Sequence, residues 1–311
     1  MKCLVTGATG FIGRSLCRSL KGRGDELVAI NRSGAPVTDT IPGIACDLAV
    51  DDVDASYLEG VDVVYHLAGI AHQSAPESAY AALNYGATVR LARRARESGV
   101  RKFVFLSSVK AMGPPTGREV RAENDCNAPV GPYARSKREA EEALLQEYAT
   151  GPMAVLIVRP ALVYGPGVKG NLRQLAIAVQ RRLPRPPEGG RRSMIALADL
   201  TDLLCHIPGH APAGNHTWIA CGAGSYSTRD VYDLMRAALG WGRGSAWLAR
   251  PAWWLGAAVM DLRSPGRGES TYSKLFGAEL YANQRVVTDT GWRPSVRLED
   301  SIAPLLAGAR S

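Results

Sequence analysis

The sequence predicts an α/β fold with a doubly wound parallel sheet and a smaller C-terminal α/β domain. In the first half, short runs of apolar and β-branched residues alternate with helical patterns. The chain has 311 residues, 46% of them hydrophobic, which is enough for one large or two modest domains. We expect one domain at residues 1–165 and a second at residues 166–311, with a segment near 192–222 returning to the first.

A glycine-rich turn follows the first predicted strand, Lys2–Thr6, and precedes a helical pattern. Its glycines, Gly7, Gly10 and Gly13, have the spacing G-x-x-G-x-x-G. Glycine lets a backbone turn tightly and approach a pyrophosphate, whose charge meets the N-terminus of the helix. This order of strand, turn and helix is typical of a Rossmann-like dinucleotide-binding domain. The alternative is a turn that only closes a β–α unit.

The second predicted strand, residues 26–30, ends in Asn31, Arg32 and Ser33 rather than in an acidic residue. An acid at this point would hold the ribose hydroxyls of NAD, whereas an arginine accommodates the 2′-phosphate of NADP. We therefore predict that the cofactor is NADP(H) in preference to NAD(H). The alternative is that Arg32 is only a surface charge after a strand.

Two further predicted strands are expected to end beside the dinucleotide cofactor. Residues 43–48 end in Asp47, which suits a hydrogen bond from the adenine amine, and Leu48, which would flank the ring. The alternative for Asp47 is the N-cap of a helix. Residues 61–69 run into a loop of small residues, which let a backbone pass close to a cofactor. The loop residues in question are Leu67, Ala68 and Gly69.

A long helix is predicted at residues 76–98, with Asn84 as a polar residue on its apolar side. A satisfied structural amide and a role in supporting catalysis are both open for Asn84. His66 is flanked by apolar residues, so we expect it in the core. The histidines and the six cysteines lack metal-ligand spacing, which predicts no metal site and reduced thiols in a cytoplasm.

Tyr133 and Lys137 lie four residues apart in a helix predicted at residues 132–148, so they share a helical face. A phenol has a pKa of about 10 and transfers protons poorly near neutral pH. A cation one turn away lowers that pKa. Ser108, just after a strand predicted at residues 102–106, offers a hydroxyl to hold a carbonyl or alcohol oxygen beside the phenol. The alternative is a core tyrosine and a solvated lysine.

The net charge of +8 at pH 7 suits an anionic small ligand, a nucleic acid or an acidic membrane. The basic residues are scattered and form no nucleic-acid motif, so we expect no nucleic-acid partner. We also expect no transmembrane segment and no secretory signal. The most apolar run, residues 252–260, is predicted to be a buried helix rather than a membrane-surface contact. We assign no role to Trp253 and Trp254 within it.

Together these residues resemble the extended short-chain dehydrogenase/reductase family, in its nucleotide-sugar branch, the NAD-dependent epimerase/dehydratase family. The matching motifs follow the family order over nearly the whole chain: T-G-x-x-G-F-I-G at 6–13, D-L at 47–48, H-L-A-G at 66–69, S-S-V-K-x-x-G at 107–113, Y-x-x-x-K at 133–137 and R-P-x-x-V-Y-G-P-G at 159–167. The resemblance implies three catalytic roles. Tyr133 is the general acid/base, Lys137 lowers its pKa and holds the nicotinamide ribose, and Ser108 holds the substrate oxygen. The motifs also add three cofactor contacts: Phe11, Ile12 and Pro160.

The second half resembles the same branch in two places. Asn171 opens a helix where the branch has an asparagine that contacts the substrate. Residues 192–200 match the segment R-x-x-I-x-x-x-D-L, whose arginine contacts the diphosphate of a UDP-sugar. Arg192 suits that role because a guanidinium meets phosphate oxygens bidentately. The alternative is a solvated pair, Arg191 and Arg192.

The resemblance also limits the reaction. A 4,6-dehydratase has an Asp-Glu pair just after the Ser or Thr, where this chain has Val109 and Lys110. We assign no role to Lys110. Most 4-epimerases have an acid after the second strand, where this chain has Arg32 and Ser33. The pattern is most similar to bacterial 4-ketoreductases acting on a UDP-4-keto-6-deoxy-N-acetylhexosamine.

Such a reductase would give UDP-N-acetylquinovosamine or UDP-N-acetylfucosamine for surface polysaccharide such as O antigen. The resemblance further implies a homodimer. Three alternatives stay open: a UDP-sugar 4-epimerase with tightly bound NAD, a reductase of steroid-like or flavonoid-like ketones, and, outside the enzymes, an NADP(H)-binding sensor or scaffold. The last class usually loses the tyrosine or the lysine, and this chain keeps both.

Overall fold

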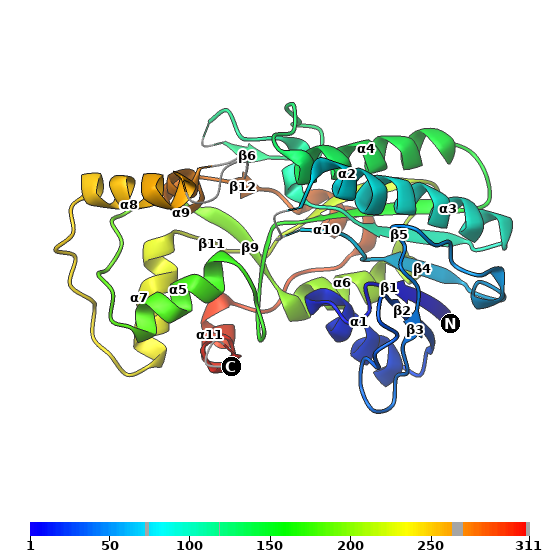
Figure 1. The fold of residues 1–311 in the computed structure, drawn as a ribbon, viewed down its shortest axis with the longest axis horizontal. Helices are drawn as coiled ribbons and strands as arrows, with labels where there is room; N and C mark the ends of the chain where they lie inside the picture. Colours follow the sequence, from blue (N-terminus) through cyan, green and yellow to red (C-terminus); the bar gives the residue numbers. More distant parts are fainter. Residues whose placement is uncertain (72–74, 118, 263–269, 309–311) are drawn as a thin grey trace.

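The computed structural model describes residues 1–71, 75–117, 119–262 and 270–308. A parallel sheet forms its centre. Its strands are β1 (Lys2–Thr6), β2 (Glu26–Asn31), β3 (Ile44–Ala45), β4 (Val63–His66), β5 (Lys102–Leu106), β7 (Ala154–Pro160) and β10 (His216–Ala220). The seven strands lie in the order β10-β7-β5-β4-β1-β2-β3 (Figure 1). The predicted α/β class with a doubly wound parallel sheet is confirmed.

Helices cover both faces of this sheet. The helices are α1 (Phe11–Gly22) and α6 (Leu197–His210) on one face, and α3 (Ala87–Glu97) and α4 (Pro132–Glu147) on the other (Figure 1). Strand β1 shows why both faces are apolar: Cys3 and Val5 join the core cluster of α1 and α6, while Leu4 joins that of α3 and α4. Successive side chains of a strand point to opposite faces, so a strand between two helical layers must be apolar throughout.

The segment predicted as one helix at residues 76–98 is interrupted. It consists of α2 (Glu77–Tyr80), a π-helical turn η2 (Ala81–Gly86) and α3. The prediction of a single regular helix is therefore wrong in its middle. Asn84 lies in the π-helical turn and is fully buried. A π-helical turn is often found at a functional site.

Helix α4 begins where the sequence predicted it. Pro132 is its first residue, a position where proline's missing N–H leaves no hydrogen bond unmade. Between β5 and α4 lie a short helix η3 (Val109–Met112) and β6 (Val120–Arg121), which pairs with β12 (Leu280–Tyr281). This pairing brings a segment from near the end of the chain beside the loop after β5.

The C-terminal half contains a second sheet of three strands in the order β11-β9-β8. These strands are β8 (Leu162–Tyr164), β9 (Arg192–Ala196) and β11 (Ser225–Tyr226). Its helices are α5 (Asn171–Gln180), α7 (Thr228–Ala238), α8 (Arg250–Leu262), α9 (Thr271–Phe276), α10 (Gln284–Thr290) and α11 (Leu298–Gly308). Residues 192–222 contribute to both halves, since β9 belongs to the small sheet and β10 pairs with β7.

Helix α8 contains the apolar run that was predicted to be buried. The run is helical, but Trp254 and Leu255 are 58% and 60% exposed. The prediction of a buried helix is therefore wrong. Figure 1 places α8 at the end of the molecule farthest from β1 to β4. Among the residues described, no helix has the length and apolarity needed to cross a membrane.

Candidate active site

The predicted cofactor residues follow the C-terminal ends of the central strands. All neighbouring pairs in the central sheet are parallel, so these ends lie along one edge. That edge carries Gly7 after β1, Asn31 to Ser33 at the end of β2, Asp47 and Leu48 after β3, Leu67 to Gly69 after β4, Ser108 after β5 and Pro160 at the end of β7. In doubly wound sheets, ligands bind at this edge.

The glycine turn leaves no room for side chains. Gly7 has φ +66°, and a Cβ there would lie 2.8 Å from the amide nitrogen of Ala68. A Cβ on Gly13 would lie 2.2 Å from the carbonyl oxygen of Gly7. Gly10 is the N-cap of α1, and no described side chain caps the first amides of that helix. Uncapped amides at a helix N-terminus bind anions, so the turn fits the pyrophosphate of a dinucleotide.

At the end of β2, Asn31 and Ser33 form a hydrogen-bonded loop, whereas the Arg32 side chain is exposed to solvent. The buried Asn31 donates from Nδ2 to the carbonyl of Ala35 at 2.9 Å, and its Oδ1 accepts from the Ser33 hydroxyl at 3.1 Å. Asn31 therefore fixes the loop. Arg32 is exposed, and none of the residues described forms a hydrogen bond or ion pair with it. Its guanidinium is free for a phosphate, so NADP(H) preference stays a prediction.

Asp47 shapes the turn after β3. Its Oδ1 accepts a hydrogen bond from the amide of Ala49 at 3.1 Å, within a turn rather than at the start of a helix. The alternative that Asp47 caps a helix is therefore wrong. Leu48 is buried, and its carbonyl accepts from Arg90 at 2.7 Å. Both residues lie at the correct edge, and the adenine contact stays a prediction.

The three predicted catalytic residues meet between β5 and α4. Tyr133 and Lys137 lie on α4, and Ser108 caps η3 by accepting a hydrogen bond from the amide of Lys110 at 3.2 Å. Ser108 also acts on the Tyr133 phenol, since its side chain opposes the rise in the phenol's pKa. The Lys137 ammonium donates to the carbonyl of Leu106 at 2.9 Å, at the end of β5. The Ser108 hydroxyl and the Lys137 ammonium thus both lie at the C-terminal end of β5.

The electrostatics differ from the prediction. Burial raises the pKa of Tyr133, and the Ser108 side chain opposes that shift. Burial also lowers the pKa of Lys137 to about 8. The predicted lowering of the Tyr133 pKa is wrong in direction, because desolvation of the phenol is the largest cause and the Lys137 ammonium is turned to Leu106. A raised pKa keeps the phenol protonated at neutral pH.

Asn84 joins the loop after β4 to the catalytic helix. Its Oδ1 accepts from the amide of Ile70 at 2.8 Å, and its Nδ2 donates to the Ser136 hydroxyl at 3.0 Å. A Cβ on Gly69 would lie 2.9 Å from the same Oδ1, so glycine is required for this close approach. Asn84 is a satisfied structural amide that positions α4 against the cofactor loop.

His66 is a core residue, as predicted. It is fully buried at the end of β4, with Nδ1 at 2.8 Å from the Thr6 hydroxyl and Nε2 at 2.9 Å from the Thr88 hydroxyl. Burial lowers its pKa to about 3. The imidazole is therefore neutral and links β1, β4 and α3.

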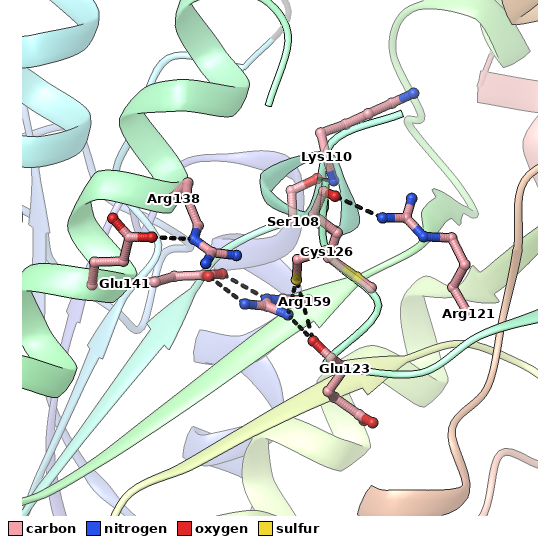
Figure 2. Close-up of polar contacts among 10 residues, drawn as sticks. Ser108, Lys110, Arg121, Glu123, Cys126, Arg138, Glu141 and Arg159 are labelled. Atoms are coloured by element: carbon pink, nitrogen blue, oxygen red, sulfur yellow. Dashed lines mark hydrogen bonds and ion pairs between the residues drawn. The ribbon is translucent and has the colours of Figure 1, made fainter. Parts of the chain in front are cut away.

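A buried ion pair that sequence reasoning missed anchors the catalytic helix (Figure 2). Arg159 of β7 donates to both carboxylate oxygens of Glu141 on α4, at 2.9 and 2.6 Å. Arg159 also donates to the carbonyl of Glu123 at 2.8 Å. Glu141 is 1% exposed. The signal was available, since Glu141 lies one helical turn after Lys137 and a buried charge needs a partner.

The predicted diphosphate ligand, Arg192, has protein partners. Its guanidinium donates to the carbonyls of Ser273 at 2.6 Å and Gly277 at 3.2 Å, and lies 3.9 Å from the Glu279 carboxylate. Arg191 is the exposed member of the pair and contacts Asp230. The alternative of a solvated pair is therefore wrong for Arg192, which ties β9 to α9.

Glu279 connects Arg192 to the catalytic loop. The other oxygen of its carboxylate accepts from the Lys110 ammonium at 2.7 Å. Sequence reasoning missed Glu279, because 169 positions separate it from Lys110 and no local pattern indicates the pair. Asn171 begins α5 and is exposed, and its side chain forms no hydrogen bond with another described residue. The structure thus links Arg192 to the catalytic loop and gives no such contact for Asn171.

Two cavities lie beside α4, with volumes of about 420 and 610 Å³. Both are lined by Cys126 and Arg138, which Figure 2 shows next to the Arg159 ion pair. Neither is lined by a predicted cofactor or substrate residue. The candidate site is therefore defined by the edge of the sheet.

The fold and the glycine turn define a Rossmann-type α/β protein. The chain belongs to the NAD dependent epimerase/dehydratase family, whose model matches residues 3–201. This confirms the resemblance at the level of the family. The reaction within the family is a separate question.

The chain is similar to relatives with different activities. It is 30% identical to a UDP-glucose 4-epimerase of Vibrio cholerae, over 96% of this chain and 92% of that protein. It is 28% identical to a 2-alkyl-3-oxoalkanoate reductase of Stenotrophomonas maltophilia (strain K279a), over 99% of each. The solved structure of MoeE5 in complex with UDP-glucose and NAD has a TM-score of 0.80 at 24% identity, covering 100% of this chain and 99% of that one.

Proposed function

We propose that this protein reduces the C4 ketone of a UDP-4-keto-6-deoxy-N-acetylhexosamine with NADPH. The product would be UDP-N-acetylquinovosamine or UDP-N-acetylfucosamine for surface polysaccharide. The observation that carries the proposal is Arg32, exposed and free at the end of β2, where the ribose of a dinucleotide lies. A reductase takes fresh hydride at each turnover, usually from NADPH, whereas a 4-epimerase keeps one NAD bound.

The catalytic groups suit the reductive direction. Bound NADPH supplies the hydride. Tyr133, protonated at neutral pH, donates its proton to the developing C4 alkoxide, which is a stronger base than the phenolate that remains. Ser108 stabilises the oxygen beside the phenol. Lys137 places positive charge at the end of β5.

The UDP-sugar is supported by two observations. The Vibrio cholerae relative is named a UDP-glucose 4-epimerase, and MoeE5 was solved with UDP-glucose. The family resemblance assigns the diphosphate contact to Arg192, which begins β9 in the second half of the chain. We propose that residues 1–165 bind the cofactor and residues 166–311 mainly the substrate, with β10 returning to the first part. We also propose a cytoplasmic homodimer.

The test is NADPH oxidation with UDP-4-keto-6-deoxy-N-acetylglucosamine as the substrate, followed by NMR of the product. We expect one product, reduced at C4, and slower turnover with NADH. Arg32→Ala should reduce the preference for NADPH about tenfold, since a phosphate contact contributes on the order of 1.4 kcal/mol. NADH used as efficiently as NADPH by the wild type would contradict the cofactor assignment. The absence of a reduced sugar would contradict the reaction.

A UDP-sugar 4-epimerase is the second candidate, and the Vibrio cholerae relative favours it. An epimerase would interconvert UDP-glucose and UDP-galactose without consuming added NADPH. It would also carry NAD through purification. Incubating the protein with each UDP-sugar and no added cofactor therefore separates the two reactions, because a reductase leaves both sugars unchanged.

A further inference from the structure

Helix α8 and the loop before it form an unusually apolar end of the molecule. Of the thirteen exposed large hydrophobic side chains among the residues described, five lie in this segment. These five are Trp247, Trp254, Leu255, Val259 and Leu262, which are between 41% and 82% exposed. A surface helix normally presents charged or polar residues to solvent, but the only charged residues of α8 are Arg250 and Asp261.

The inner side of α8 is fixed against α9, so the exposed side has a defined orientation. The Trp253 ring packs edge-on against Phe276 with centroids 6.0 Å apart. Ala257 is 3% exposed. The Asp261 carboxylate accepts hydrogen bonds from the amide of Thr271 at 3.0 and 3.1 Å. The one acid of the helix is therefore committed to an internal contact.

Up to residue 260, the charged side chains of this segment are basic. Residues 239–260 contain no Asp or Glu, and the exposed Arg243 and Arg250 lie within them. Arg250 also donates to the carbonyl of Glu188, whose carboxylate lies 3.8 Å from the Arg229 guanidinium. Arg182 places its guanidinium over the Trp241 ring at 5.0 Å, which adds a third cation beside the same loop. The whole chain carries +8. An apolar, Trp-containing face with arginines beside it complements an anionic bilayer surface.

We propose that this face, made of Trp247, Trp254, Leu255, Val259 and Leu262 with Arg243 and Arg250, docks on an anionic phospholipid bilayer. The 13-residue helix is too short to span a bilayer and would lie in the headgroup region. Docking does not depend on the proposed reaction. It would bring the substrate half near the membrane, because Arg192 contacts Ser273 in α9, the helix on which α8 packs.

The test is co-sedimentation of the full chain with vesicles of phosphatidylcholine alone or mixed with phosphatidylglycerol. We expect about thirtyfold tighter binding to the anionic vesicles, since each arginine near the surface contributes a factor of about five. Salt should weaken this binding. The tryptophan emission should shift to the blue as Trp247 and Trp254 leave water. The double variant Trp254→Glu/Leu255→Glu should lose at least about tenfold in affinity, because it places charges on the apolar face.

Val50→Glu is the matched control, because Val50 is 79% exposed on the other half of the molecule. It should bind vesicles like the wild type, and thermal melting of each variant confirms folding. No binding to phosphatidylglycerol vesicles at low salt would overturn the proposal. So would a dimer that dissociates in the double variant without vesicle binding, because the face would then contact a second copy. Equal losses in the double variant and Val50→Glu would also overturn it.

Discussion

The two halves of the chain differ in how their candidate residues are held. In the cofactor half, most of the predicted residues, such as Gly7, Asp47 and Ser108, lie within three positions of a strand end, and the parallel sheet aligns these ends by itself. In the substrate half, Arg192 is held by carbonyls more than eighty positions away, and Asn171 has no contact with it. A site built on strand ends is encoded locally, whereas one built on crossing segments depends on long-range contacts.

Replacement of Tyr133 by Phe gives the largest expected effect and tests the cofactor half. Turnover should fall about a thousandfold, because the phenol proton is lost while the ring is kept. NADPH affinity should stay within about twofold, since Lys137 and the glycine turn are intact. The measurement is steady-state NADPH oxidation together with a binding titration. Tyr85→Phe, on an exposed tyrosine, is the control, and residual activity within tenfold of wild type would contradict the assignment.

The buried pair Arg159–Glu141 provides the next largest effect, on stability. Glu141→Ala should lower the free energy of unfolding by about 3 kcal/mol, because it leaves a buried guanidinium unpaired. The neighbouring Glu142 contacts Arg138 at the surface, so Glu142→Ala should cost about 0.5 kcal/mol or less. Urea unfolding of both variants provides the comparison. Similar losses would show that the pair does not anchor α4.

The titration of Lys137 should make the stability of the protein depend on pH. Burial lowers its pKa from 10.5 to about 8, so below about pH 8 the folded protein carries a destabilising buried charge. The unfolded chain binds more protons between about pH 8 and 10.5, and stability should rise over that range. Relative to Lys137→Met, the wild type should gain about 3 kcal/mol from pH 7 to pH 10.5. The free energy of unfolding of the wild type and of Lys137→Met is measured by urea denaturation at several pH values across this range. Lys21→Met, on an exposed lysine, should show no such trend.

The sequence predicted β1, β2 and β5 closely because each carries a local signal, whereas the strand predicted at residues 43–48 is only Ile44–Ala45. Lys2–Thr6 and Lys102–Leu106 were placed to the residue, and the helix of Tyr133 within one residue of its end. The π-helical turn at Asn84 was missed because it depends on hydrogen bonds to Ile70 and Ser136. The exposure of α8 was missed for a related reason, since hydrophobicity alone does not show whether a neighbour covers it.

The pKa of Tyr133 was missed because it depends on burial and on where the Lys137 ammonium points, which spacing does not give. Glu279 was missed because it and its partners, Lys110 and Arg192, come from three segments that are distant in the sequence. In both cases the sequence shows the residue types but not which groups surround their side chains. Side-chain environments, both within the cofactor half and between the two halves, are therefore the part that required a structure.

Arg192 gives the smallest predicted effect and tests the substrate half directly. Arg192→Ala should weaken binding of UDP about tenfold, because one charge-assisted phosphate contact is lost, and change NADPH binding less than about twofold. Arg191→Ala is the matched control, since its guanidinium is exposed and paired with Asp230. Calorimetric titration with UDP and with NADPH measures both. Equal losses of the two ligands would mean that Arg192 only ties β9 to α9, because loss of that tie would disturb both halves alike.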